Sequence, residues 1–201
     1  MIFDKFYPIF DTSEWLKRLL PIGIKFVQLR IKDKSKKEIQ SEIKKAKLLC
    51  YDFNAQLVVN DYWEMAIDEK CDFVHIGQED LVNCNIKKLK SNNIKIGIST
   101  HDREELKTAL LHSPDYIALG PIYPTILKKM KWTQQGVDKL SEWKKQISHI
   151  PLVAIGGMTP PRSTEAFIAG ADIVSAVTDI TLNPDPEARV KEWLETIKNN
   201  V

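Results

Sequence analysis

The chain has 201 residues, a length that favours one domain, and we expect a single domain over residues 1–201. Its 29 Lys and Arg residues nearly balance its 27 Asp and Glu residues, so bulk charge indicates neither a nucleic-acid partner nor a membrane partner. The sequence has no apolar run near the roughly 18 residues of a membrane-spanning helix, and its N-terminus does not resemble a secretory signal. The three cysteines match no zinc or redox spacing, so we expect reduced thiols in a cytoplasmic protein.

Short apolar segments typical of β-strands alternate with helical patterns along the whole chain. The expected strands are residues 6–10, 25–30, 56–60, 72–76, 94–98, 116–119, 151–155 and 173–176. The expected helices are residues 15–20, 35–53, 63–67, 86–91, 102–111, 137–147, 161–169 and 186–197. Apolar residues recur at intervals of three and four in the helical segments, which is the period of an amphipathic helix.

The alternation itself predicts the fold class. Parallel neighbours cannot be joined by a tight hairpin, so a strand followed each time by a helix predicts a parallel sheet with helical crossovers. Eight such units fit either a closed barrel or an open doubly wound sheet. The first strand lacks the glycine-rich turn expected of an open nucleotide-binding sheet, because Tyr7 to Asp11 contain no glycine. We therefore expect an α/β protein with a compact (β/α)₈ TIM barrel.

A basic cluster ends the second expected strand. Side chains alternate along a strand, so Gln28, Arg30 and Lys32 point to one side. In a barrel the functional site is built at the carboxyl ends of the strands. Two cations and an amide at that end suit a multiply charged anion. An exposed basic strand end is the alternative interpretation.

Two carboxylates follow the next two strands. Asp61 comes directly after the third strand, next to Asn60, and Asp80 follows the fourth. Mg²⁺ is commonly held by one or two carboxylates together with substrate phosphates, so the pair predicts a magnesium site beside the basic cluster. Alternatively, each aspartate caps the helix that follows it.

A second anion site is indicated by the last strands. Gly156 and Gly157 end the seventh strand just before a helix, where backbone N–H groups can bind phosphate. Val177 and Thr178 follow the eighth strand, and phosphate sites after strands seven and eight recur in this fold. The further candidates follow strands five and six and are Ser99, Thr125 and Lys128. Two anion sites point to an enzyme that handles two phosphorylated small molecules.

The motifs, taken in order, resemble those of the thiamine-phosphate synthase family. They are QLRIK at 28–32, ND at 60–61, VHIGQED at 74–80, GIS at 97–99, GPIYPT at 120–125 and IGG at 155–157. The resemblance implies a Mg²⁺-dependent transferase that joins a hydroxymethylpyrimidine diphosphate to a hydroxyethylthiazole phosphate. Thiamine phosphate and pyrophosphate would be the products. It implies small-molecule substrates, no nucleic acid and no membrane, and it leaves a homo-oligomer open.

The resemblance also implies a role for each matching residue. The diphosphate would be bound by Gln28, Arg30, Lys32, Asn60, Ser99 and Lys128. Of these, Arg30, Lys32, Ser99 and Lys128 would be catalytic, and Arg30, Lys32 and Lys128 would stabilise charge on the leaving group. Mg²⁺ would be bound by Asp61 and Asp80. The thiazole phosphate would be held by Thr125, Gly157, Val177 and Thr178.

Two positions depart from the family pattern. Leu127 replaces a hydroxyl residue, and Asp179 places an acid beside the expected phosphate site, which is unfavourable unless it points away. These departures leave two alternatives: a thiazole tautomerase-like paralogue, or a non-catalytic barrel that binds a phosphorylated ligand. Among the histidines, His75 is expected in the core or between the sheet and helix layers, and His101 is the only one expected near the site.

Overall fold

Eight parallel strands form one sheet in which each strand lies beside the next in chain order. The computed structural model describes residues 3–125, 132–147 and 149–199. The strands are β1 (Ile9–Phe10), β2 (Phe26–Leu29), β3 (Gln56–Asn60), β4 (Phe73–Ile76), β5 (Lys95–Thr100), β6 (Tyr116–Leu119), β7 (Leu152–Ile155) and β8 (Ile173–Ser175). The sheet closes on itself because Tyr7 N donates to Val174 O at 2.9 Å and Ile9 N donates to Ala176 O at 3.0 Å. The predicted (β/α)₈ barrel is thereby confirmed.

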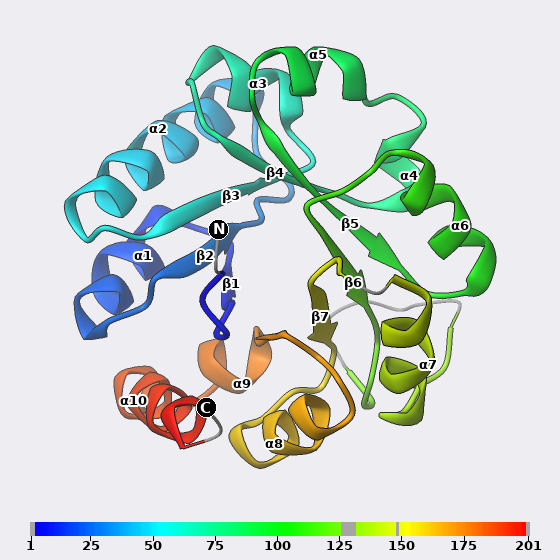
Figure 1. Ribbon diagram of the computed structural model, residues 1–201. Helices are drawn as coiled ribbons and strands as arrows, with labels where there is room; N and C mark the ends of the chain where they lie inside the picture. The colour runs from blue at the N-terminus through cyan, green and yellow to red at the C-terminus, as the bar shows by residue number, and fades with distance from the viewer. Residues whose placement is uncertain (1–2, 126–131, 148, 200–201) are drawn as a thin grey trace.

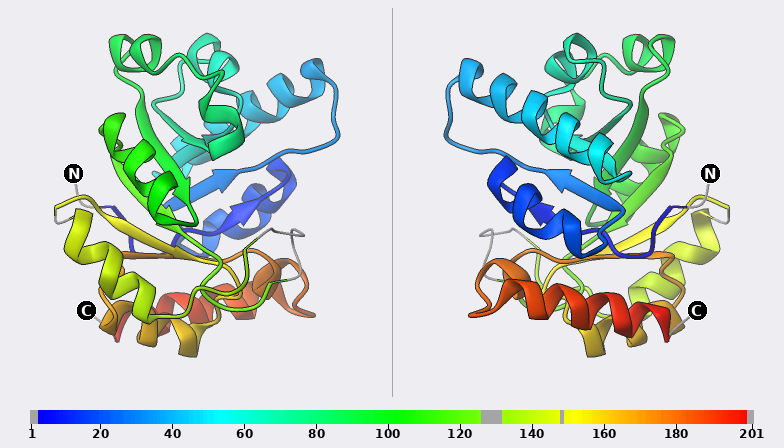
Figure 2. Two further views of the ribbon diagram at one scale, coloured as in Figure 1. Left: turned by 90° about the vertical axis from the view of Figure 1, so that its right-hand side faces the viewer. Right: turned by 90° about the vertical axis from the view of Figure 1, so that its left-hand side faces the viewer.

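Helices surround the strands on the outside of the barrel (Figure 1). They are α1 (Ser13–Leu19), α2 (Lys36–Asp52), α3 (Trp63–Asp68), α4 (Gln78–Leu81), α5 (Ile86–Ser91), α6 (Arg103–Leu111), α7 (Asp138–Ile147), α8 (Pro160–Ile168), α9 (Thr178–Thr181) and α10 (Pro186–Lys198). A 3₁₀ turn, Leu20–Ile22, follows α1. Side views show α2 and α10 as long helices on different sides of the strands (Figure 2). The short helices α4 and α9 directly follow β4 and β8 and were not predicted.

Helix α2 illustrates how the sequence determines where a helix begins and which of its faces is buried. Ser35 and Glu38 form a reciprocal capping box at its N-terminus, which satisfies backbone N–H groups that the helix leaves open. From there the apolar residues recur on one face, and Ile39, Ile43 and Ala46 are fully or almost fully buried. Burial of this face holds the helix against the sheet, while its lysines face solvent.

Aromatic side chains fill the interior of the barrel at its amino end. Tyr7 stacks on Phe26 with ring centroids 4.1 Å apart, and Phe73 lies 5.5 Å from Tyr116. Phe3 packs against Phe26 from the N-terminal segment, with centroids 5.4 Å apart. This packing leaves the carboxyl ends of the strands as the open end of the barrel.

The first strand is shorter than predicted. Residues 6–10 were expected to form a strand, but only Ile9 and Phe10 pair with β2, and Phe6 makes a single bridge to Val174. Proline has no N–H to donate, so Pro8 interrupts the ladder of hydrogen bonds. Only its carbonyl is used, as the acceptor for Gln28 N at 3.0 Å.

Across the described residues, no helix is long and apolar enough to span a membrane.

Candidate active site

A cavity of about 260 Å³ opens at the carboxyl ends of the strands. The candidate residues that line it are Gln28, Arg30, Lys32, Asn60, Asp61, Asp80, Ser99, Thr125, Gly157, Val177 and Thr178. They come from seven different strands or the segments that follow them, so the barrel brings together residues up to 150 positions apart. The remaining candidate, Lys128, lies outside the described residues, as does Leu127.

The Asp61 carboxylate is held in place by two donors. Its backbone has a positive φ of 63°, and the residue turns the chain directly after β3. Lys32 Nζ lies 2.8 Å from Asp61 Oδ2, and Asn60 Nδ2 donates to the same oxygen at 2.5 Å. The alternative that Asp61 and Asp80 cap helices is wrong, because Tyr62 and Gly77 occupy the N-cap positions of α3 and α4.

The other oxygen of Asp61 faces Asp80. Asp61 Oδ1 and Asp80 Oδ2 lie 4.0 and 3.7 Å from the point where a Cβ on Gly77 would be, so both flank the same side of this glycine. Burial and the neighbouring Asp61 carboxylate raise the pKa of Asp80 above its ordinary value. Two neighbouring carboxylates form a donor set that fits a divalent cation.

Asp61 and Asp80 form a pair of acidic side chains without a third His, Cys, Asp or Glu ligand in the described part of the chain. No group of three or more His, Cys, Asp or Glu side chains that could hold a metal occurs there. Mg²⁺ commonly keeps several waters and takes further oxygens from substrate phosphates. The residues therefore fit Mg²⁺ when it arrives with, or is completed by, an anionic substrate.

The glycine pair after β7 lies on the other side of the cavity. Gly156 and Gly157 have positive φ values of 96° and 62°, which glycine adopts without strain. A Cβ on Gly157 would lie 2.4 Å from Pro124 O, and one on Gly156 would lie 2.6 Å from Pro121 Cα. Both glycines are thus required by the close approach of the segment after β6, as well as lining the cavity.

Asp179 points away from the cavity and is neutralised by its partners. Arg189 donates to both of its oxygens, with Nε to Oδ2 at 2.8 Å and Nη2 to Oδ1 at 2.7 Å. Trp193 Nε1 also donates to Oδ2, at 2.7 Å. The acid that departs from the family pattern is therefore a structural group that ties α9 to α10. It leaves Val177 and Thr178 free of a facing negative charge.

His75 is buried, as expected, but the expectation that His101 is the only histidine near the site is wrong, because His75 also lines the cavity. It is buried in β4, yet it lines the cavity, and its Nε2 lies 2.7 Å from Ser99 Oγ. Burial lowers the pKa of His75 to about 4, so the imidazole is neutral at neutral pH. The alternation along residues 72–76 could have placed it on the inward side, because it lies two residues from Phe73.

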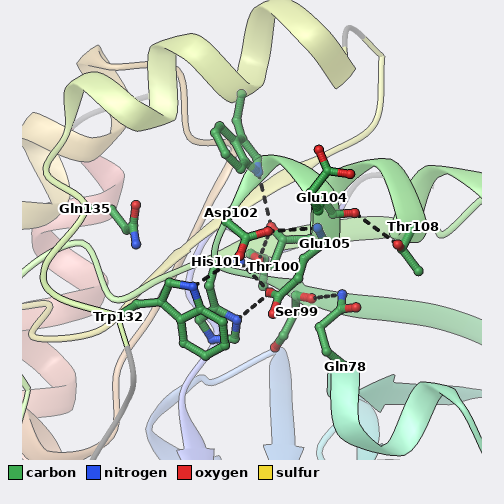
Figure 3. Close-up of polar contacts among 12 residues, drawn as sticks. Gln78, Ser99, Thr100, His101, Asp102, Glu104, Glu105, Thr108, Trp132 and Gln135 are labelled. Carbon is green, nitrogen blue, oxygen red and sulfur yellow. Dashed lines mark hydrogen bonds and ion pairs between the residues drawn. The ribbon is translucent and has the colours of Figure 1, made fainter.

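His101 also lines the cavity, where it forms a rim with Trp132 (Figure 3). The two rings stack with centroids 4.2 Å apart and an angle of 13° between their planes. His101 Nδ1 lies 2.7 Å from Glu105 Oε2, and Trp132 Nε1 donates to Asp102 Oδ2 at 3.3 Å. Trp132 is thereby a wall of the site, a role that its sequence position alone could not separate from packing.

Ser175 is a further cavity residue that sequence reasoning missed. Its side chain is buried at the end of β8, and its Oγ has no hydrogen-bond partner among the residues that the structure describes. A buried hydroxyl of this kind is expected to bond a ligand or a water molecule. It lies on the same side of the cavity as Val177 and adds a polar group there.

Known proteins match this chain over almost its full length. The family model for thiamine monophosphate synthase matches residues 4–180. A thiamine-phosphate synthase of Rhizobium etli is 52% identical over 194 residues, covering 96% of this chain and 95% of the relative. A thiamine-phosphate synthase of Salmonella typhimurium is 38% identical over 188 residues, covering 94% and 89%.

A solved structure agrees with these sequence matches. The thiamine phosphate pyrophosphorylase from Pyrococcus furiosus superposes with a TM-score of 0.87 at 25% identity, covering 98% of this chain and 96% of that one. The fold, the order of the motifs and the sequence identity all lead to one assignment. The chain belongs to the thiamine monophosphate synthase family, whose members are transferases.

Proposed function

We propose that the cavity transfers a hydroxymethylpyrimidine group from its diphosphate to the ring nitrogen of hydroxyethylthiazole phosphate. The bond between the methylene carbon and the diphosphate oxygen breaks, and the diphosphate leaves with the electron pair. The thiazole nitrogen then supplies the pair for the new carbon–nitrogen bond. The nucleophile is an aromatic nitrogen, so the step needs no general base. The products are thiamine phosphate and pyrophosphate.

Besides membership of the family, the proposal rests on one observation about the cavity. The cations Arg30 and Lys32 line the same cavity as the carboxylates Asp61 and Asp80, at the carboxyl end of the barrel. A leaving diphosphate gathers negative charge, and a site with fixed cations and a place for a divalent metal stabilises that charge. Mg²⁺, when bound by Asp61 and Asp80, would neutralise part of this charge.

Two separate sets of residues would bind the two substrates. Gln28, Asn60 and Ser99 would orient the pyrimidine diphosphate, and Arg30, Lys32 and Ser99 would bind its oxygens. Lys128 would join them from outside the described residues. The thiazole phosphate would be held by Thr125, the backbone of Gly157, Val177 and Thr178. The ion pair of Asp179 with Arg189 supports this second site, because it removes the acid that would repel the phosphate.

The state of the three cysteines is consistent with a reducing compartment, such as the cytoplasm. Cys50, Cys71 and Cys84 are all free. Free thiols persist in the cytoplasm, where small biosynthetic substrates are also available, so we propose that the chain acts there.

The proposal is tested by product stoichiometry. The purified chain would be incubated with both substrates and with either one alone, and thiamine phosphate and pyrophosphate would be measured by chromatography. We expect equal amounts of the two products, and only when both substrates are present. Pyrophosphate without thiamine phosphate would contradict transfer to the thiazole. Conversion of the thiazole phosphate alone to an isomer would favour the tautomerase-like alternative.

A further inference from the structure

A chain of four hydrogen bonds crosses the interior of the barrel beneath the cavity. Gln28 Nε2 donates to Tyr7 Oη at 2.8 Å, and Tyr7 Oη lies 2.8 Å from Tyr116 Oη. Tyr116 Oη lies 2.7 Å from His75 Nδ1, and His75 Nε2 lies 2.7 Å from Ser99 Oγ. Gln28, His75 and Ser99 all line the cavity, whereas the two tyrosines lie between them in the interior. Ser99, at the end of this series of hydrogen bonds, is its only member with an aliphatic hydroxyl.

The barrel interior has room for the residues that form these four hydrogen bonds. Tyr7, Gln28 and Tyr116 are each 2% exposed or less. A Cβ on Gly97 would lie 2.0 Å from Tyr116 Cζ, so a glycine is needed at this position of β5 to admit the phenol ring. Burial raises the pKa values of both tyrosines, so their hydroxyls keep their protons. The phenols are therefore available as neutral donors and acceptors in fixed positions.

The number of protons available to these four hydrogen bonds favours one direction of donation, from Gln28 toward Ser99. The Gln28 amide nitrogen can only donate, so Tyr7 accepts from it. Among the described contacts, Tyr116 Oη is then the acceptor that satisfies the buried Tyr7 proton. Tyr116 in turn gives its proton to His75 Nδ1, which is the acceptor left to it among the described contacts. A neutral imidazole that accepts at Nδ1 carries its proton on Nε2 and donates it to Ser99 Oγ. The Ser99 proton is then not used by the chain.

We propose that Gln28, Tyr7, Tyr116 and His75 are positioning residues that hold the Ser99 hydroxyl as a hydrogen-bond donor toward an anionic oxygen in the cavity. In the proposed function, on which this inference rests for its ligand, that oxygen belongs to the diphosphate. Accepting a bond from His75 polarises the Ser99 O–H and strengthens it as a donor. The reverse direction would present a serine lone pair to an anion, which is repulsive.

The backbone of Ser99 is fixed as well. Gln78 Nε2 donates to Ser99 O at 2.7 Å, which ties the end of β5 to the start of α4 (Figure 3). With its carbonyl held by Gln78 and its Oγ held by His75, the serine has one degree of freedom left, the rotation of its hydroxyl proton. A ligand oxygen in the cavity is the acceptor that would set that rotation.

The first test reads the histidine tautomer without any substrate. The full chain would be labelled with ¹⁵N-histidine, and the ring signals of His75 would be assigned by their loss in His75→Gln. We expect the Nε2–H tautomer, with Nδ1 as an unprotonated acceptor. In Tyr116→Phe the donor to Nδ1 is absent, so this preference should weaken. An Nδ1–H tautomer in the unsubstituted protein would overturn the inference, whatever the enzyme's activity.

The second test asks whether Tyr116 acts through Ser99. Turnover would be measured for Tyr116→Phe, Ser99→Ala and the double variant, with Tyr51→Phe as a control because Tyr51 is 84% exposed on α2. We expect Tyr116→Phe to lower kcat about tenfold and to leave the KM for the thiazole phosphate unchanged. In the Ser99→Ala background the same change should have little further effect. Equal losses in both backgrounds would overturn the inference and assign Tyr116 a packing role. Tyr7→Phe serves as a second variant should Tyr116→Phe fold poorly.

Discussion

Lys32 Nζ lies 2.8 Å from Asp61 Oδ2, so the cation proposed to bind the diphosphate contacts the carboxylate proposed to bind the metal. The lysine side chain is 46% exposed and the aspartate side chain 12% exposed. A contact this open to solvent adds little to stability. It keeps Lys32 over the cavity in the free protein and leaves Asp61 Oδ1 directed toward Asp80.

Removal of the Lys32 charge should weaken the protein's interaction with the diphosphate substrate. In Lys32→Met, one charge-assisted bond to the leaving group is lost, and we expect kcat/KM for the pyrimidine diphosphate to fall roughly tenfold or more. The KM for the thiazole phosphate should change much less. Steady-state kinetics with each substrate varied in turn measures both values. Lys34→Met is the matched control, because Lys34 is exposed and lies outside the cavity. Equal losses in the two variants would contradict a specific role for Lys32.

Mg²⁺ and pyrophosphate should stabilise the protein together. Two carboxylates alone leave most of the coordination sphere to water and phosphate oxygens, so we expect Mg²⁺ alone to raise the melting temperature only slightly. Mg²⁺ with pyrophosphate should raise it further, and Asp80→Asn should lose this joint shift. Asp68→Asn, an exposed aspartate on α3, should keep it. A joint shift of the same size in Asp80→Asn would rule Asp80 out as a ligand.

The sequence was sufficient for the fold because the barrel is built from local signals repeated eight times. Each strand is a short apolar run, and each long helix has an amphipathic face, as in Ile39 and Ile43 of α2. Strand alternation also placed Gln28, Arg30 and Lys32 on one side, and all three line the cavity. These inferences need only periods of two and 3.6 residues.

The sequence could not supply the contacts between distant side chains. Tyr7 and Tyr116 are 109 residues apart, and nothing in the sequence around either one distinguishes it from a core aromatic residue. The neutralisation of Asp179 depends on Arg189 and Trp193, which lie on another helix. His75 is buried as expected, but its place at the cavity was missed, because its contact with Ser99 depends on the neighbouring strand.

The Asp179 ion pair should contribute to stability. In Arg189→Met the Asp179 carboxylate, 14% exposed, keeps the Trp193 donor but loses both guanidinium bonds. We expect a loss of about 2 kcal/mol in the free energy of unfolding, less than the 3–5 kcal/mol typical of a fully buried pair. Urea denaturation measures this value. Arg18→Met breaks the exposed pair with Glu187 and should leave the urea midpoint nearly unchanged. Equal midpoints for the two variants would contradict this account.

The buried thiols should react slowly in the folded protein. Burial raises the pKa of Cys50 to about 12 and that of Cys71 to about 11, so little thiolate is present at neutral pH. We expect slow alkylation by iodoacetamide at pH 7.5, a faster reaction as the pH rises toward 9, and rapid alkylation of both residues in urea. Mass spectrometry of tryptic peptides gives the rate at each cysteine. Alkylation of Cys50 as fast in the native protein as in urea would show that its environment is open.

Asp61 and Asp80 are proposed to hold Mg²⁺ for departure of the diphosphate from the pyrimidine, and this role can be tested directly. Its most direct test is the initial rate of thiamine phosphate formation with both substrates present, in Mg²⁺ and in EDTA, for the unsubstituted chain and for Asp61→Asn. We expect product in Mg²⁺, a loss of activity in EDTA that added Mg²⁺ restores, and almost no product from Asp61→Asn under either condition. Undiminished product formation in EDTA, or by Asp61→Asn, would contradict this role.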